Sequence, residues 1–248
     1  MTDTMQVFDR KLVQRHRERA APGFAGSDFL IRESAVRLAD RLLDVTRAFP
    51  LALDLGCHAG ALGEELKSSP KIGALFQSDL SAAMGKTAHA ANNRPTICAD
   101  EELLPFGPQS LDLVLSNLSL HWVNDLPGAL AQIRLALKPD GLLLATLFGT
   151  ETLKELRNVL IDAEVEIAGG AAPRVSPFTD VRDAGNLLTR AGFSLPVVDT
   201  ETITVTYSDM FKLMADLRAM GETNAVLERR RVPTRRDVLL RAAARRLT

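Results

Sequence analysis

Short apolar segments alternate with amphipathic segments between residues 50 and 148, and this alternation restricts the possible fold more than any other feature. Strands are expected at 51–55, 72–76, 96–99, 111–116 and 142–148. Helical spacing of apolar residues marks the intervening segments 60–68, 82–91 and 126–137. The alternation predicts an α/β fold with a doubly wound, mostly parallel, Rossmann-like sheet and helices on both faces.

The segments on either side of this core are expected to be helical elaborations. We divide the chain into an N-terminal helical segment (1–48), an α/β core (49–149) and a C-terminal helical lid or substrate region (150–248). Within the last region, residues 197–207 are rich in β-branched residues, which predicts a strand that extends the sheet. Met210 and Met214 lie on one face of a predicted helix and are expected to pack in a core.

Three candidate ligand-binding stretches follow consecutive strands. The first, Asp54 to Gly60, reads D-x-G-x-x-x-G, and its glycines allow a sharp turn and close approach of a ligand to the backbone. Asp79 closes the second strand, and Asp100-Glu101 closes the third. Because ligands of open parallel sheets bind at the carboxyl ends of strands, these residues are expected to meet at one site.

The chemistry of these stretches favours S-adenosylmethionine (SAM) over a dinucleotide. An acid at the start of the loop would repel a pyrophosphate but suits the cationic methionine end of SAM. Asp79 can accept both ribose hydroxyls, and a carboxylate of Asp100-Glu101 can accept the adenine amino group. The candidate cofactor residues are Asp54, Gly56, Cys57, Gly60, Asp79, Leu80, Asp100, Glu101, Ser116 and Asn117.

His121 and Trp122 follow the fourth strand and are the catalytic candidates. One interpretation makes them a base and an aromatic wall for the acceptor. The alternative is a histidine that holds a loop by hydrogen bonds and a tryptophan in the core. None of the four histidines pairs with another at ligand spacing, so no metal is expected.

Several longer strings resemble a known family. They are 49–57 (FPLALDLGC), 99–106 (ADEELLPF), 118–127 (LSLHWVNDLP) and 176–179 (SPFT). With the Asp54 loop, Asp79, Asp100 and the turn at 138–141, they resemble the class I SAM-dependent methyltransferases. Within that group the chain resembles, over residues 7–244, the complex I assembly factor 5 family and its bacterial relatives. More distantly it is similar to the biotin-pathway methyltransferase that esterifies a malonyl carrier protein.

The resemblance implies a SAM-dependent methyltransferase that acts on a protein or carrier-protein acceptor, with a respiratory complex I subunit as the implied partner. Arginine hydroxylation, which is credited to the assembly factor family, and a non-catalytic SAM-binding assembly role are the alternatives. His58 stands where methyltransferases usually carry the middle glycine of the loop, so its side chain either crowds the cofactor or points to solvent. The family also continues beyond Thr248 to one more strand, so the sheet edge is expected to be incomplete.

Charge is segregated along the chain. The net charge is −1, but residues 10–19 sum to +4 and residues 229–248 to +7, which leaves about −12 elsewhere. The cationic ends either recruit an acidic protein partner or form solvated helix faces.

Nucleic acid and a transmembrane segment are not expected. Two cysteines fit a reducing compartment, either the bacterial cytoplasm or, in a eukaryote, the mitochondrial matrix. The oligomeric state stays open.

Overall fold

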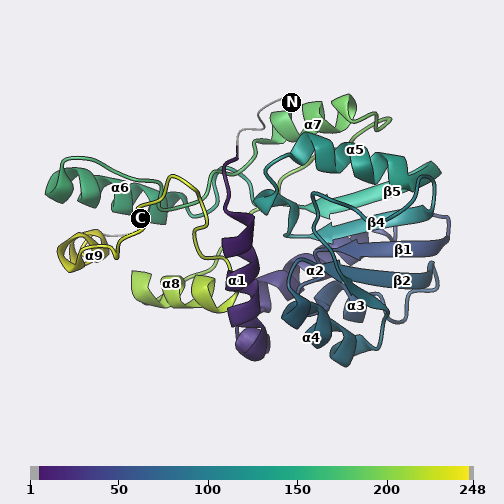
Figure 1. The fold of residues 1–248 in the computed structure, drawn as a ribbon, viewed down its shortest axis with the longest axis horizontal. Helices are drawn as coiled ribbons and strands as arrows, with labels where there is room; N and C mark the ends of the chain where they lie inside the picture. The colour runs from purple at the N-terminus through teal and green to yellow at the C-terminus, as the bar shows by residue number, and fades with distance from the viewer. Residues whose placement is uncertain (1–5, 246–248) are drawn as a thin grey trace.

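A five-stranded parallel sheet in the order β3-β2-β1-β4-β5 forms the centre of the computed structural model, which describes residues 6–245 (Figure 1). The strands are β1 (Phe49–Leu55), β2 (Ile72–Asp79), β3 (Thr96–Cys98), β4 (Leu111–Asn117) and β5 (Leu137–Thr146). On one side of β1, Phe49 pairs with Ile72 of β2. On the other side, Asp54 pairs with Leu115 of β4. The predicted parallel α/β sheet is therefore confirmed.

Both faces of the sheet are covered by helices. Ala52 and its neighbours on one face pack against α2 (Phe29–Arg41), α3 (Ala61–Glu65) and α4 (Ala82–Asn92). Leu53 and Leu55 face α5 (Leu126–Ala136) and α7 (Val181–Arg190) on the other face. Alternate residues of β1 thus enter two different cores, which is why this strand is apolar almost throughout.

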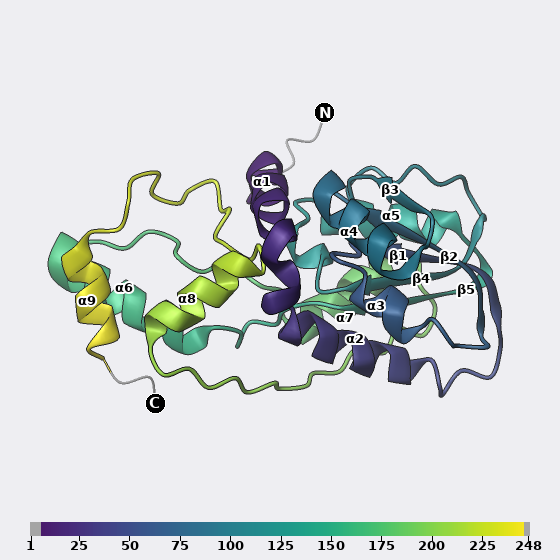
Figure 2. The same cartoon turned by 90° about the horizontal axis from the view of Figure 1, so that it is seen from below.

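Helix α1 (Arg10–Ala20) stands between the carboxyl ends of the strands and the C-terminal helices (Figures 1 and 2). It begins at Asp9, whose side chain accepts a hydrogen bond from the Leu12 amide, and it continues into a 3₁₀ turn, η1 (Ala21–Gly26). An antiparallel bridge between Phe8 and Val226 joins the N-terminal segment to the C-terminal region.

The C-terminal helices form a smaller core of their own. Helices α6 (Lys154–Ala168), α8 (Met210–Ala219) and α9 (Arg236–Ala243) gather around Leu160, Met210 and Val238, and Met214 packs against them. The expected core role of the methionines is confirmed. Among the helices of residues 6–245, none is both long and apolar enough to span a bilayer.

The strand predicted at 197–207 is wrong. This segment has no regular secondary structure, and Val197 is 88% exposed. β-Branched residues favour a strand only where a neighbouring strand offers backbone partners and a surface to pack on. Over the described residues the sheet ends at β5, and the 197–207 segment does not pair with it.

One local prediction also differs from the structure. The predicted turn at 138–141 lies inside β5 as an irregularity of the strand pairing. Leu111 pairs with Leu137 but Leu113 pairs with Leu142, so extra residues of β5 bulge out between them. In the C-terminal half, Asp180 caps α7, and α9 starts after Arg235 with no side-chain cap.

Candidate functional site

The loop after β1 turns sharply and is tied to the end of β2. The amides of Gly56 and Cys57 donate to the carbonyl of Ser78 at 2.8 and 2.9 Å. Gly56 has φ +74°, and a Cβ there would lie 2.0 Å from the Ser119 hydroxyl. Gly60 has φ +89° and precedes α3. Glycine is required at these two positions because the backbone conformation and the close neighbours leave no place for a side chain.

Asp54 is buried at the end of β1, below this loop. Its Oδ2 accepts a 3.3 Å hydrogen bond from Gln77 Nε2, and its Oδ1 has no partner among the described residues. The pKa of Asp54 is raised to about 7, mainly by burial and to a smaller extent by the nearby charge of Asp79, while the hydrogen bond from Gln77 opposes the shift. Asp54 is therefore only partly ionised near neutral pH.

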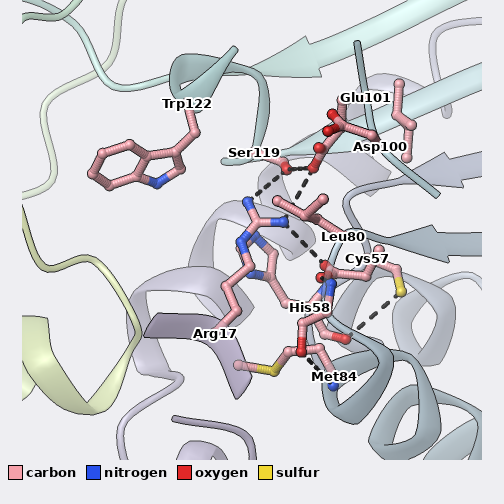
Figure 3. Close-up of polar contacts among 12 residues, drawn as sticks. Arg17, Cys57, His58, Leu80, Met84, Asp100, Glu101, Ser119 and Trp122 are labelled. Atoms are coloured by element: carbon pink, nitrogen blue, oxygen red, sulfur yellow. Dashed lines mark hydrogen bonds and ion pairs between the residues drawn. The ribbon is translucent and has the colours of Figure 1, made fainter. Parts of the chain in front are cut away.

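Asp79 and Glu101 come together at the carboxyl ends of the strands, and the guanidinium of Arg17 lies between them. Figure 3 shows Arg17 pointing toward Glu101 and Ser119. Arg17 Nη1 is 3.3 Å from Asp79 Oδ2 and 3.1 Å from Glu101 Oε1, and Nη2 donates to Ser119 Oγ at 2.8 Å. The Ser119 hydroxyl donates in turn to Glu101 at 2.7 Å. All four side chains are buried. We call these four residues the Arg17 cluster.

Arg17 and Glu101 are the charged pair of the Arg17 cluster. Burial alone would raise the pKa of Glu101, but Arg17, Arg10 and the Ser119 hydroxyl outweigh it and lower the pKa to about 2. Burial likewise opposes the charge of Arg17, yet Asp79 and Glu101 raise its pKa. A buried guanidinium between two carboxylates is stable here because each charge has a partner.

Arg10 extends the cluster toward the solvent. Its guanidinium bonds Asp100 and Glu101, and Nη1 donates to the Trp122 carbonyl at 3.1 Å. Asp100 is the more exposed acid of its pair, and Glu101 is the buried one. The positive segment 10–19 was interpreted either as a solvated helix face or as a surface that recruits an acidic partner. Both interpretations are wrong for Arg10 and Arg17, because these side chains pair with acids inside the protein. Arg10 and Arg17 are seven residues apart, which places them on the same face of α1. This spacing is the sequence signal that could have identified both as residues of the site.

The carboxylate of Asp79 has three partners in the fold. Its Oδ2 lies beside Arg17 and accepts the His58 amide at 3.0 Å, while Oδ1 accepts the Ser81 amide at 2.8 Å. Because Oδ1 has this one partner, it keeps an acceptor position that a ligand hydroxyl can use. The residue types fit an adenosyl ligand, with a loop free of side chains at its two glycines and acids after β2 and β3.

The side chain of His58 is buried in the interior of the protein. It has φ +50°, and its Nε2 lies 3.1 Å from each of the carbonyls of Asn117 and Leu118, so the ring donates from Nε2. The imidazole stacks on Phe24 with an interplanar angle of 8°. Burial and the charge of Arg17 lower the pKa of His58. The expectation of solvent exposure, one of the two alternatives, is wrong.

The remaining cofactor candidates make contacts within the fold. Ser116 donates to the Leu55 carbonyl at 2.8 Å, and Asn117 donates to the Ile31 carbonyl at 2.9 Å. Cys57 is buried, with Sγ 3.6 Å from the His58 carbonyl, and the Leu80 carbonyl accepts from Gln14 Nε2 at 3.1 Å. These contacts position the strand ends around the loop.

His121 and Trp122 lie in the 3₁₀ turn η2 (Leu120–Trp122) and share a partner that sequence reasoning missed, Glu222. Glu222 Oε2 lies 3.1 Å from His121 Nε2 and accepts from Trp122 Nε1 at 2.9 Å. The rings of Phe148 and Phe178 lie 4.7 and 6.0 Å from His121. Glu222 follows α8 and lies 101 positions from His121 in the sequence. Local sequence patterns therefore could not identify it as the partner of His121.

Known proteins resemble this chain over most of its length. Residues 53–145 match the family described as a methyltransferase domain. The human protein named arginine-hydroxylase NDUFAF5, mitochondrial, is 47% identical over 97% of this chain and 70% of its own length. A malonyl-[acyl-carrier protein] O-methyltransferase from Methylovorus sp. (strain MP688) is 36% identical over 99% of this chain and 84% of its own length.

Solved structures share the fold at lower identity. A SAM-dependent methyltransferase from Thermotoga maritima is 20% identical with a TM-score of 0.54, covering 73% of this chain and 81% of that one. Haemonchus contortus phosphoethanolamine N-methyltransferase 2, bound to S-adenosylhomocysteine, is 18% identical with a TM-score of 0.55, covering 73% and 44%. These solved structures, with the parallel sheet and the glycine loop described above, show the class I methyltransferase fold. The 47% identity to the human protein shows that the chain belongs to the NDUFAF5 family of class I methyltransferase-fold proteins.

Proposed function

We propose that this chain binds SAM at the carboxyl ends of β1, β2 and β3 and transfers the methyl group to a protein acceptor. The observation that carries the proposal is the convergence of the Gly56 loop with Asp79 and Glu101 on adjacent strands. SAM supplies a methyl group on a positively charged sulfur. Transfer forms a bond from the acceptor atom to the methyl carbon, leaves the carbon–sulfur electron pair on sulfur, and releases a proton from the acceptor.

The residues divide into ligand-holding and acceptor-facing roles. Gly56 and Gly60 let the backbone approach the methionine end of the cofactor. Asp54 Oδ1, a buried acceptor with no partner in residues 6–245, is available to the ammonium group of that end. Asp79 accepts the ribose hydroxyls, and Asp100 or Glu101 accepts the adenine amino group. His121, after β4, lies toward the acceptor, and alignment of donor and acceptor supplies most of the rate.

The name of the malonyl-[acyl-carrier protein] O-methyltransferases supports a macromolecular acceptor, since it refers to a carrier protein, whereas the name of the other relatives refers to arginine. In this proposal residues 49–149 hold the cofactor, while 1–48 and 150–248 close over it and receive the acceptor. A respiratory complex I subunit is the acceptor that the resemblance suggests. Both cysteines are free, in keeping with action in a reducing compartment such as the bacterial cytoplasm or the mitochondrial matrix.

Arginine hydroxylation is a second candidate, favoured by the printed name of the 47% identical relative. Hydroxylation inserts one oxygen atom into a carbon–hydrogen bond. With dioxygen as oxidant, the other oxygen leaves as water after taking two electrons and two protons from a reductant. A methyltransferase fold by itself does not decide between the two reactions.

Two measurements test the proposal. Calorimetry of the purified chain with SAM and with S-adenosylhomocysteine should show binding, and no binding at millimolar ligand would refute the cofactor assignment. Mass spectrometry of a complex I subunit incubated with the chain, SAM, dioxygen and a reductant then identifies the reaction. A gain of one methylene supports methyl transfer, a gain of one oxygen supports hydroxylation, and an unchanged mass with normal SAM binding supports a non-catalytic assembly role.

A further inference from the structure

The carboxylate of Glu222 contacts two ring nitrogens through one oxygen. Its side chain is 5% exposed. Oε2 accepts a hydrogen bond from Trp122 Nε1 at 2.9 Å and lies 3.1 Å from His121 Nε2. Because Trp122 Nε1 can only donate, Oε2 serves as an acceptor, and hydrogen bonds to a carboxyl oxygen favour the ionised form of the group. The buried group beside His121 is therefore a carboxylate.

This contact fixes which nitrogen of His121 carries the hydrogen. A carboxylate can only accept, so Nε2 must carry a hydrogen in order to bond Oε2. In the neutral imidazole the other nitrogen, Nδ1, then holds a lone pair. Nδ1 is buried, and no group of residues 6–245 donates to it. Neutral His121 thus has a basic nitrogen that the fold does not use.

His121 lies at the carboxyl end of the sheet, where the acceptor is proposed to approach. It belongs to η2, which begins directly after Ser119 of the Arg17 cluster. The centroid of its ring is 4.7 Å from that of Phe148, which follows β5, and 6.0 Å from that of Phe178. Both phenylalanines are only half-buried, so the ring cluster that contains His121 reaches the surface at these two residues.

Glu222 also suits the cation that His121 becomes once it takes up a proton. A carboxylate in hydrogen-bond contact stabilises an imidazolium strongly in a buried place, where the effective dielectric constant is low. The second oxygen, Oε1, is buried and has no hydrogen-bond partner in the part of the chain that the structure describes. The recorded ion pairs of Arg17 are with Asp79 and Glu101. The charge of Glu222 is therefore available to His121.

We infer that His121 is the general base of the methyl transfer and that Glu222 is the positioning residue that fixes its tautomer. The acceptor atom forms its bond to the methyl carbon while the carbon–sulfur pair stays on sulfur. The proton that the acceptor loses passes to Nδ1 of neutral His121, and it leaves to solvent after the product departs. The inference rests on the proposed function, because it assigns the proton that this reaction releases.

The first test identifies the tautomer of His121 directly. Long-range proton–nitrogen NMR spectra of the full chain, isotope-labelled at its histidines, distinguish a hydrogen on Nε2 from one on Nδ1. His121 is assigned through the contacts of its ring with Trp122 and Phe148. The neutral imidazole of the wild type should carry its hydrogen on Nε2 alone. Glu222→Gln offers an amide N–H as well as a carbonyl to Nε2, so both tautomers should be present.

The second test measures methyl transfer to the complex I subunit that gains a methylene in the mass-spectrometric experiment. His121→Gln keeps an N–H for Glu222 but removes the Nδ1 lone pair, so kcat should fall by about a hundredfold or more. Glu222→Gln should lower kcat by about tenfold or more, because part of His121 adopts the wrong tautomer. The KM for SAM should stay within about twofold in both variants, since neither side chain is a proposed cofactor contact.

Glu228→Gln is the matched control, since Glu228 is exposed in the same segment after α8 and loses the same charge. It should change neither kcat nor the tautomer. If Glu222→Gln does not fold, Glu222→Asp replaces it and should lower kcat as well, because the shorter side chain moves the carboxylate away from Nε2.

The outcomes separate the two roles. A hydrogen on Nδ1 of the neutral imidazole in the wild type, or an unchanged kcat in His121→Gln, would overturn the base. An unchanged tautomer or an unchanged kcat in the Glu222 variant would overturn the positioning role. Absence of SAM binding or of a methylene gain with the wild type refutes the proposed function, whereas methyl transfer that does not depend on His121 refutes only this inference.

Discussion

The guanidinium of Arg17 lies 3.3 Å from the carboxylate of Asp79, although the two residues are 62 positions apart in the chain. Arg17 comes from helix α1, and Asp79 comes from the end of β2, where the cofactor ribose is proposed to bind. Helix α1 is therefore coupled to the proposed cofactor site through a buried ion pair. Any ligand that takes over Asp79 changes the electrostatic balance that holds α1 in place.

Arg17→Met should lower the free energy of unfolding by about 3–5 kcal/mol, because it leaves Asp79 and Glu101 buried without their cation. Urea denaturation followed by circular dichroism measures the loss. Arg15→Met is the control, since Arg15 is exposed on the same helix, and its effect should stay within about 0.5 kcal/mol. Adding Glu101→Gln to Arg17→Met should cost less than the two single changes together. Simple additivity would argue against the Arg17 cluster as an energetic unit.

Asp79→Asn should weaken SAM binding by about tenfold or more, since the ribose hydroxyls lose a charged acceptor. Calorimetry of the wild type and the variant measures the change, after circular dichroism has shown that both are folded. Asp44→Asn is an exposed control with the same charge change and should bind SAM like the wild type. Equal affinity in all three proteins would place the ribose away from Asp79.

Asp54 should make the protein less stable as the pH rises. Its pKa is about 7 in the folded chain, above its ordinary value of 3.8. Between these two values the folded state holds a proton that the unfolded state has released, so stability falls by up to about 1.4 kcal/mol per pH unit. Above about pH 7 this contribution is constant. Asp54→Asn should remove the slope in urea midpoints measured from pH 4.5 to 8, and an identical slope in the variant would contradict the prediction.

His58→Gly should leave SAM affinity nearly unchanged while it lowers the melting temperature. The imidazole is held by the carbonyls of Asn117 and Leu118 and by stacking on Phe24, and the substitution removes these contacts. Part of the loss is offset because glycine adopts φ +50° without strain. Calorimetry and thermal unfolding separate the two effects. A gain of tenfold or more in SAM affinity would show that His58 crowds the cofactor.

Local patterns in the sequence were sufficient to predict the scaffold of the site. Apolar runs and helical spacing predicted the parallel sheet, and a parallel sheet places the Asp54 loop, Asp79 and Glu101 at one edge, the carboxyl ends of its strands. Gly56 and Gly60 were identified by the turn they must make. These inferences succeed because strand period, helix period and backbone conformation depend on near neighbours in the chain.

Tertiary packing alone decided the electrostatics and the acceptor side of the site. Whether Arg17 faces solvent or two buried acids depends on where α1 docks, and whether Glu222 meets His121 depends on the turn after α8. The 197–207 segment shows the same limit, since its β-branched residues form a strand only beside a partner strand. Such contacts join residues many positions apart, and their free energy comes from burial and charge pairing that no local pattern records.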